Sequence, residues 1–149
     1  MKTHKESLDL VAEIMINTQI ILISIEATKD INASNDYQAT MKVRGVSPIS
    51  SEKGLQTRPY AGIRYQNAKT VDYHYGVRNS EETENRKAYK GKSATTPFIG
   101  LEIVTNLTSH LTLDPNLDYE SRANSIRNSP LTNGKKYDLK GAISITYWF

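Results

Sequence analysis

The sequence predicts an all-β fold: an antiparallel up-and-down transmembrane β-barrel of about eight strands that forms part of a larger barrel. Runs of alternating apolar and polar residues, most of them about nine to eleven residues long, cover about half of the chain. The pattern contains no long amphipathic helix. The aromatic residues are nine tyrosines, one tryptophan and two phenylalanines, a set suited to a surface that is half in water.

The strand-like runs contain β-branched, aliphatic and aromatic residues and are separated by polar, turn-forming segments. In chain order the predicted strands are residues 8–17, 20–28, 37–46, 56–66, 72–78, 97–105, 109–119 and 138–149. The first two lie in the most apolar part of the chain. Most of these runs have the length of a tilted strand that crosses a membrane.

Alternation gives each predicted strand two different faces. The third strand places Ala39, Met41 and Val43 on one side and Lys42 and Arg44 on the other. The same alternation recurs in the fourth, fifth, sixth and last strands. Because a soluble sandwich or a soluble ligand-binding barrel shows one-sided apolarity as well, the alternation alone leaves a soluble protein open.

Connection lengths favour a membrane barrel. If the last strand ends in the periplasm, the connections at 106–108 and 67–71 are short and periplasmic. The connections at 120–137, 79–96 and 47–55 are then long, polar and external. Short turns on one side and long loops on the other are typical of outer-membrane barrels. The highly charged loop 79–96 fits a solvated external loop or an adhesive surface.

The aromatic residues give an independent indication of depth. On the same count, strand ends place five rings at the periplasmic rim, where a girdle of aromatic residues is expected. These are Tyr37, Tyr65, Tyr73, Tyr147 and Phe149.

Composition excludes several kinds of site. At 149 residues the chain is one domain by length, and its net charge of +3 is spread without a basic run, so we predict no nucleic-acid partner. The absence of cysteine excludes disulfides, thiolate zinc sites and thiol nucleophiles. The apolar segment 10–25 is interrupted by Glu13 and Asn17, which excludes a helical membrane span. Glu6 and Asp9 do not fit a signal peptide, so we expect the export signal to be absent from this sequence.

Several motifs resemble the MipA/OmpV family of outer-membrane proteins. They are TVDYHYGVRNSEE at 70–82, Tyr89, TPFIGLEIVTNLTSHLTL at 96–113 and SIRNSPLT at 125–132, followed by the aromatic end. Their order and spacing resemble the C-terminal part of that family. Family members begin with a signal peptide and further strands, so the resemblance implies that residues 1–149 are an N-terminally truncated barrel domain.

The resemblance also implies a location and a role. The family is named for an interaction with MltA, a lytic transglycosylase, and is thought to act in the outer membrane of Gram-negative bacteria. Its implied role is that of a non-enzymatic scaffold, which brings this murein hydrolase together with a penicillin-binding protein in peptidoglycan assembly. Other members are discussed as porin-like channels or adhesins, and both roles stay open here.

One group of charged residues is a candidate lumen site. Asp72, His74 and Arg78 share a face of the predicted strand 72–78, with Glu102 near them. They could form a binding or acid–base site. We favour mutual charge pairing, because a barrel interior is polar.

Other charges are expected on the same lumen-facing side. The cations are Lys42, Arg44, Arg64 and Lys140, and their expected partners are Glu13, Glu26, Asp72 and Glu102. We predict no catalytic, cofactor or metal site. A triad of Ser109, His110 and Asp114 is disfavoured, because four strand residues separate the last two by about 13 Å.

The chain ends in KGAISITYWF, residues 140–149. Its outward face resembles the signal that the barrel-assembly machinery reads on its clients, and the same face would contact outer-membrane lipid. The residues of this predicted assembly signal are Ile143, Ile145, Tyr147 and Phe149.

Overall fold

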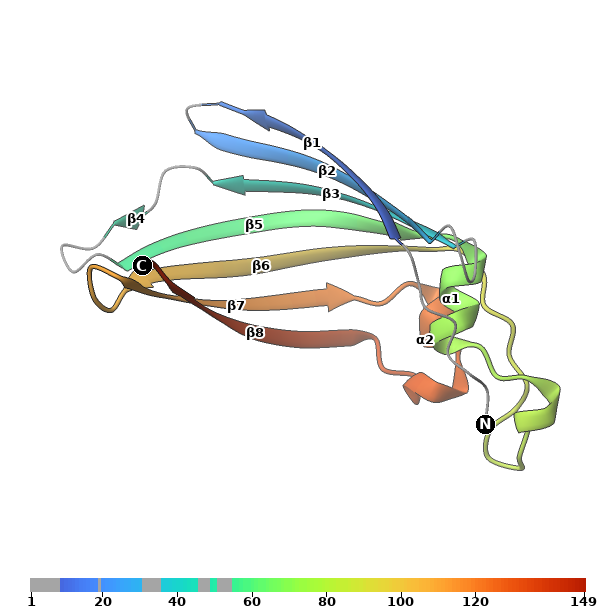
Figure 1. The fold of residues 1–149 in the computed structure, drawn as a ribbon. Coiled ribbons are helices and arrows are strands. Elements are labelled where there is room, and N and C mark those ends of the chain that lie inside the picture. Colours follow the sequence, from blue (N-terminus) through green and yellow to red (C-terminus); the bar gives the residue numbers. More distant parts are fainter. Residues whose placement is uncertain (1–8, 19, 31–35, 46–48, 51–54) are drawn as a thin grey trace.

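The computed structural model describes residues 9–18, 20–30, 36–45, 49–50 and 55–149, and its main feature is one curved antiparallel sheet (Figure 1). The long strands are β1 (Asp9–Asn17), β2 (Ile21–Asp30), β3 (Tyr37–Gly45), β5 (Leu55–Gln66), β6 (Ala94–Asn106), β7 (Leu111–Ser121) and β8 (Tyr137–Tyr147). Each pairs with the next in the order β1-β2-β3-β5-β6-β7-β8, while the short β4 (Ile49–Ser50) pairs with β5. The predicted all-β, up-and-down antiparallel fold is therefore confirmed. In the described residues β1 and β8 do not pair, so the sheet is not closed.

The predicted strand at 72–78 is wrong, because this part of the chain forms the helix α1 (Ala68–Tyr75). Asn67 caps the helix: its Oδ1 accepts a hydrogen bond from the backbone N–H of Thr70 at 2.8 Å. At the other end, the Gly76 N–H donates to the Asp72 carbonyl. Residues Thr70 and Val71 are buried, whereas Asp72 is exposed.

Because residues 68–75 form a helix and not a strand, the connections are distributed between the two ends of the sheet differently from the prediction. The β1–β2 and β6–β7 turns and the end of β8 lie together, and we call this the turn end. The connections 67–93 and 122–136 lie at the opposite, loop end. The expected short turn at 67–71 is wrong, because it is the start of α1. The strands on either side of the 47–55 segment place that connection at the turn end, which corrects its expected external position.

The loop end is folded and carries a small core. Helix α1, helix α2 (Asn124–Arg127) and the 3₁₀ turn η2 (Pro130–Thr132) contact one another there, and the turn η1 (Asn79–Glu81) follows α1 in the chain. The core consists of Val71, Ala94 and Ile126, with Tyr75 and Ala123 packed against it. Since Ala94 is the first residue of β6, this core fixes both helices to the sheet. None of the described helices is long and apolar enough to cross a membrane.

Candidate functional site

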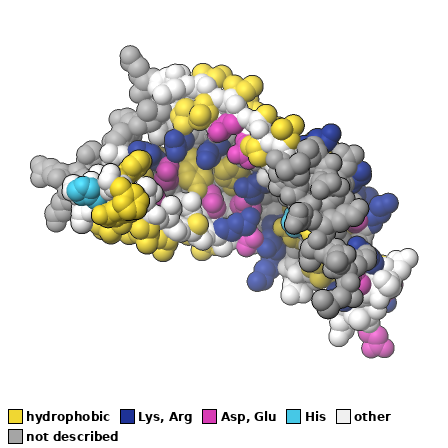
Figure 2. Space-filling model, viewed as in Figure 1, with side chains coloured by type: hydrophobic (Ala, Val, Ile, Leu, Met, Phe, Trp, Pro, Cys, Tyr) yellow, Lys and Arg dark blue, Asp and Glu magenta, His cyan; other side chains and the backbone are white. Residues whose placement is uncertain are grey.

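The two faces of the sheet have opposite chemistry. One large apolar side chain from each long strand shares the outward face, and each is between 42% and 72% exposed. These are Ile14, Ile25, Met41, Ile63, Ile99, Leu117 and Ile143. Figure 2 looks into the other, concave face, where Lys, Arg, Asp and Glu side chains gather in the hollow. A sheet with an apolar outer face and a polar inner face is typical of an outer-membrane barrel.

The first ion cluster on the concave face centres on Glu102 of β6. Its Oε2 pairs with Arg44 Nη1 of β3 at 2.9 Å, and its Oε1 lies 3.9 Å from Arg58 Nη1 of β5. All three side chains are about a quarter exposed. The cluster therefore joins three neighbouring strands through partly buried charges.

The second ion cluster centres on Glu120 of β7. Its two carboxylate oxygens pair with Arg64 Nη1 of β5 at 2.5 Å and with Lys140 Nζ of β8 at 2.7 Å. The Glu120 side chain is only 6% exposed. A buried carboxylate needs such partners, because its loss of hydration is otherwise uncompensated.

An aromatic pair lies between the two ion clusters. The rings of Tyr60 and Phe98 meet edge to face at 6.3 Å, and the Tyr60 hydroxyl donates to Asp118 Oδ1 at 2.6 Å. Each ring covers a glycine on the adjacent strand: a Cβ on Gly100 would overlap the Tyr60 ring, and a Cβ on Gly62 would overlap the Phe98 ring. Because Gly62 and Gly100 have no side chains, the two rings can lie directly against the sheet.

Cations cover both rings of this pair. Lys42 Nζ lies 5.4 Å from the centre of the Tyr60 ring, and Arg64 Cζ lies 5.3 Å from the centre of the Phe98 ring. These distances allow cation–π attraction. The aromatic pair and the ion clusters therefore form one continuous polar surface across β3 to β8.

The structure separates the residues of the predicted lumen group. Glu102 lies on the concave face, as expected, but Asp72 and His74 lie on α1 and Arg78 follows it. Their expected common strand face is wrong, because the segment is helical. Asp72 instead accepts a hydrogen bond from the Gly91 N–H at 2.7 Å.

The expected partners of the lumen cations are partly right. Arg44 does pair with Glu102, whereas Arg64 and Lys140 share Glu120, a residue of the predicted connection 120–137. The described ion pairs include neither Glu13 nor Glu26. The strand β7 continues to Ser121, two residues beyond the predicted end, so Glu120 lies on the same face as Asp118. The alternation of the two faces, continued past Tyr119, was the sequence signal that could have identified Glu120 as a partner.

The aromatic rings form two groups at opposite ends of the sheet. At the loop end, the ring centres of Tyr37 and Tyr65 lie 5.8 Å apart with the rings tilted, and Tyr119 stacks on Tyr137 at 5.3 Å. At the turn end, Tyr147 meets Phe149 at 5.1 Å.

The expected single rim is therefore wrong, because β3 begins and β5 ends at the loop end. Tyr73 lies on α1 rather than on a strand. Two aromatic girdles, one at each interface, are the usual arrangement of an outer-membrane barrel.

The last strand has the two faces that its sequence predicts. Ile143, Ile145 and Tyr147 lie on the outward face of β8 and are more than half exposed, and Phe149 follows the strand. Recognition of these residues by the barrel-assembly machinery stays a prediction.

The described residues do not suggest a catalytic or metal centre. Ser109 Oγ lies 2.8 Å from His110 Nδ1 in the β6–β7 turn, and both residues are exposed. No group of three His, Asp or Glu side chains in the described ranges could hold a metal ion.

Known proteins with similar sequences are outer membrane proteins, which agrees with a sheet that has an apolar outer face and a polar inner face. Residues 1–149 match the family model described as MltA-interacting protein MipA. Outer membrane protein Omp26La of Vibrio anguillarum is 28% identical over 91 residues, which are 61% of this chain and 35% of that protein. Outer membrane protein OmpV of Vibrio cholerae is 29% identical over 91 residues, with the same shares. The 24 kDa outer membrane protein of Pasteurella multocida is 25% identical over 97 residues, which are 64% of this chain and 37% of that protein.

The aligned region therefore spans 35–37% of the length of these relatives. No solved structure matches the chain. The relatives share an outer-membrane location, which decides against the alternative of a soluble ligand-binding barrel.

Proposed function

Because the chain is an outer-membrane protein that belongs to the MltA-interacting protein MipA family, we propose that it acts as a non-enzymatic scaffold in peptidoglycan assembly. The scaffold brings a lytic transglycosylase together with a penicillin-binding protein. The observation that carries this proposal is the family match over residues 1–149, whose description names MltA as the partner. Outward apolar residues on every long strand support an anchor in lipid.

The turn end is the proposed docking surface. Barrels of this kind have short turns on the periplasmic side, and a murein enzyme works in the periplasm. The β6–β7 turn exposes Leu107 and His110, and the Trp148 N–H donates to the His110 carbonyl at 2.9 Å. Leu107 and Trp148 are 55% and 63% exposed, so apolar surface is available at this end.

A binding assay with a matched pair of variants tests the scaffold. The protein in detergent is immobilised and exposed to a purified lytic transglycosylase and, separately, to a penicillin-binding protein. Leu107→Glu at the turn end should weaken transglycosylase binding at least about tenfold, because a charge enters the contact. Leu131→Glu, an exposed leucine at the loop end, should leave binding unchanged. Failure of the wild-type protein to bind either enzyme would contradict the proposal.

The charged concave face favours a second function, that of a porin-like channel. Ion pairs such as Arg44–Glu102 and Lys140–Glu120 line this face, and a polar lining suits a water-filled passage. Planar-bilayer recording distinguishes the two functions. Discrete conductance steps that change with Glu102→Gln would favour the channel, whereas a silent bilayer together with enzyme binding would favour the scaffold.

A further inference from the structure

The start of α1 is attached to a strand that is not its neighbour in the chain. The helix follows β5 after one residue, yet its first turn is bonded to β3. The Tyr37 carbonyl of β3 accepts hydrogen bonds from the Asn67 N–H at 3.1 Å and from the Thr70 hydroxyl at 3.2 Å. These two bonds fix the point at which the chain turns from β5 into the helix.

The far end of α1 is attached to the other loop-end connection. The Tyr75 carbonyl accepts a hydrogen bond from Ser129 Oγ at 2.6 Å, and Ser129 lies between β7 and β8. The eight residues of α1 span about 12 Å, close to the roughly 14 Å of the three strand spacings that separate β3 from β7. The helix therefore reaches across the strand ends, from β3 to the β7–β8 connection (Figure 1).

The buried side of α1 lies on the concave face of the sheet. Val71 forms one buried cluster with Ala94 of β6 and Ile126 of α2. At the start of β6 buried and exposed residues alternate, and Ala94 falls in the buried set together with Phe98 of the aromatic pair. Because Phe98 is on the concave face, Ala94 is on that face too. The helices thus cover the concave face at its loop end.

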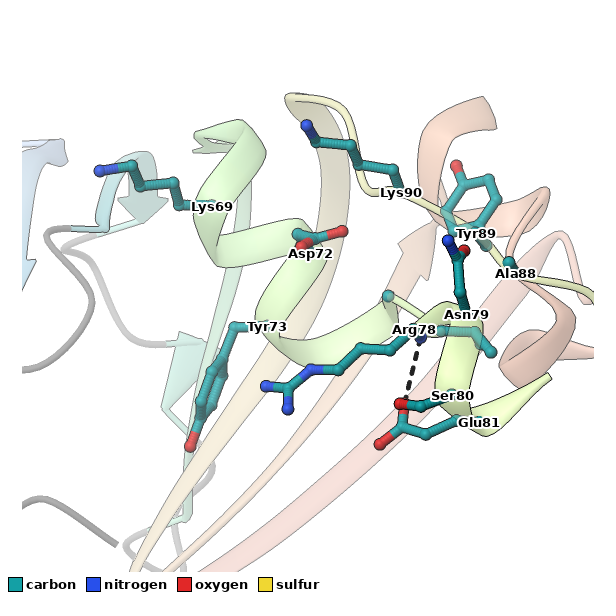
Figure 3. A pocket seen from close by; sticks show the side chains of 12 residues that line it. Lys69, Asp72, Tyr73, Arg78, Asn79, Ser80, Glu81, Ala88, Tyr89 and Lys90 are labelled. Carbon is teal, nitrogen blue, oxygen red and sulfur yellow. Dashed lines mark hydrogen bonds between the residues drawn. The ribbon is translucent and has the colours of Figure 1, made fainter. Parts of the chain in front are cut away.

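The opposite side of α1 is exposed to solvent. It carries Lys69, Asp72 and Tyr73, which line a pocket together with residues that follow the helix (Figure 3). Asp72 Oδ1 accepts a hydrogen bond from the Gly91 N–H at 2.7 Å, and a Cβ on Gly91 would overlap the Asp72 backbone. The segment around Gly91 is therefore packed on α1, and residues 67–93 are held together as one body.

Two hydroxyl groups join this body to the β7–β8 connection. The Tyr89 hydroxyl donates to the Ser125 carbonyl of α2, and the Ser129 hydroxyl donates to the Tyr75 carbonyl. Both bonds join neutral groups, and such a bond contributes only about 1 kcal/mol net. The core beneath them contains three buried residues. A region with so few buried contacts opens at a lower free energy than a sheet of long, paired strands.

We propose that residues 67–93 form a hinged lid over the loop-end part of the concave face. The hinge is the turn from β5 into α1 beside Tyr37, and the latch consists of the Tyr89 and Ser129 hydroxyls. Opening breaks both latch bonds and moves Val71 away from Ala94, so the concave face becomes accessible from the loop end. In the porin-like channel this lid would be the gate, and that consequence rests on the channel function, whereas the lid itself does not.

Cysteine labelling of the full chain in detergent micelles tests the lid. The chain has no cysteine, so each single-cysteine variant gives one reactive site for a charged methanethiosulfonate reagent. Val71→Cys, at a position that is 0% exposed, reports opening of the lid. Ser24→Cys, at a buried position of β2, reports opening of the sheet, and Ala142→Cys gives the rate at an exposed position of the concave face. We expect Val71→Cys to react at least about tenfold more slowly than Ala142→Cys.

Two double variants that each remove two hydroxyls make the test specific. Y89F with S129A removes the latch and should speed the labelling of Val71→Cys at least about tenfold, while the rates at Ser24→Cys and Ala142→Cys stay the same. Y73F with S80A removes the same groups from exposed positions of residues 67–93 and should change no rate.

Three results would overturn the proposal. The first is labelling of Val71→Cys as fast as that of Ala142→Cys in the otherwise unchanged protein, because the lid would then not cover the face. The second is an equal effect, or no effect, of the two double variants, because the hydroxyls would then not be a latch. The third is equal acceleration at Ser24→Cys, because the sheet would then open as a whole. None of these results bears on the scaffold.

Discussion

Glu120 is the residue on which the second ion cluster depends. Its carboxylate joins Arg64 of β5 to Lys140 of β8 while its own side chain is 6% exposed. We expect Glu120→Gln to lower the free energy of unfolding by about 2 kcal/mol, because two cations lose their partner on a partly buried face. The full cost of breaking a buried pair is reduced here, since the Arg64 and Lys140 side chains are 26% and 48% exposed.

Urea titration of the protein refolded in detergent micelles measures this loss. Glu84→Gln is the control, because Glu84 is exposed in the 76–93 segment and should change stability by less than about 0.5 kcal/mol. Equal stability of the two variants would show that the second ion cluster contributes nothing net to the fold.

Gly100 gives a second residue-level prediction. A Cβ there would overlap the Tyr60 ring, so Gly100→Ala should destabilise the sheet by about 2 kcal/mol through overpacking. Gly141→Ala is the matched control on β8, because its Cβ would meet only an ordinary contact, 3.6 Å from the Asn116 carbonyl oxygen. The same urea titration compares them. Adding Tyr60→Leu should recover part of the loss in Gly100→Ala, and a loss that stays the same would argue against ring overlap as its cause.

At the level of single elements, α1 depends on its N-cap. Asn67→Ala removes the acceptor for the Thr70 N–H and for the Thr70 hydroxyl, and should cost about 1 kcal/mol of local stability. Hydrogen exchange should therefore become about fivefold faster in α1 while β5 is unaffected. Asn124→Ala, at the start of α2, is the control. Faster exchange throughout the sheet would mean that α1 does not open as a separate unit.

The strands could be predicted from sequence because their alternation has a single period. β3, β5, β6, β7 and β8 each keep a period of two over at least nine residues. Helix α1 could not be predicted in the same way, because Tyr73, Tyr75 and Val77 imitate that period over a short run. The buried residues Val71 and Ile126 meet only in the folded chain. The sequence does contain two helix signals: Asn67 is an N-cap residue and Gly76 a C-cap residue, and they enclose the eight residues of α1.

The sequence predicts which face of the sheet carries the charged side chains, but it does not predict which of them form ion pairs. Alternation puts Arg44, Arg64 and Lys140 on one side of the sheet. Their partners depend on register, which connects β5 to β7 across a strand that lies between them. The predicted strand ends at Tyr119, two residues before the end of β7 at Ser121, and this was enough to leave Glu120 out.

At the scale of the whole molecule, the sheet is a curved wall with two free edges in its described part, β1 and β8. An edge strand leaves a row of backbone N–H and C=O groups without partners, and these cannot face lipid. Closing the wall requires pairing of both edges. The expectation that the chain forms part of a larger barrel fits this requirement and stays a prediction.

Neighbouring residues on β8 test which side of this wall meets the membrane. Ile143, 72% exposed on the outward face, should not tolerate a charge: Ile143→Arg is expected to reduce stability in lipid vesicles by about 2–4 kcal/mol, as for a lipid-facing position near the bilayer midplane. Ala142 is exposed on the concave face of the same strand, so Ala142→Arg should cost less than about 1 kcal/mol.

Both variants are refolded into lipid vesicles, and titration with guanidinium chloride gives the free energy of unfolding of each. The same titration in plain detergent shows whether the difference in stability between the two variants requires a bilayer. The apolar face is the lipid face only if Ile143→Arg is the costlier of the two and its excess cost falls in detergent. If Ala142→Arg were equally costly in vesicles, the concave side would also be in contact with lipid, and the polar interior inferred from the ion clusters would be wrong.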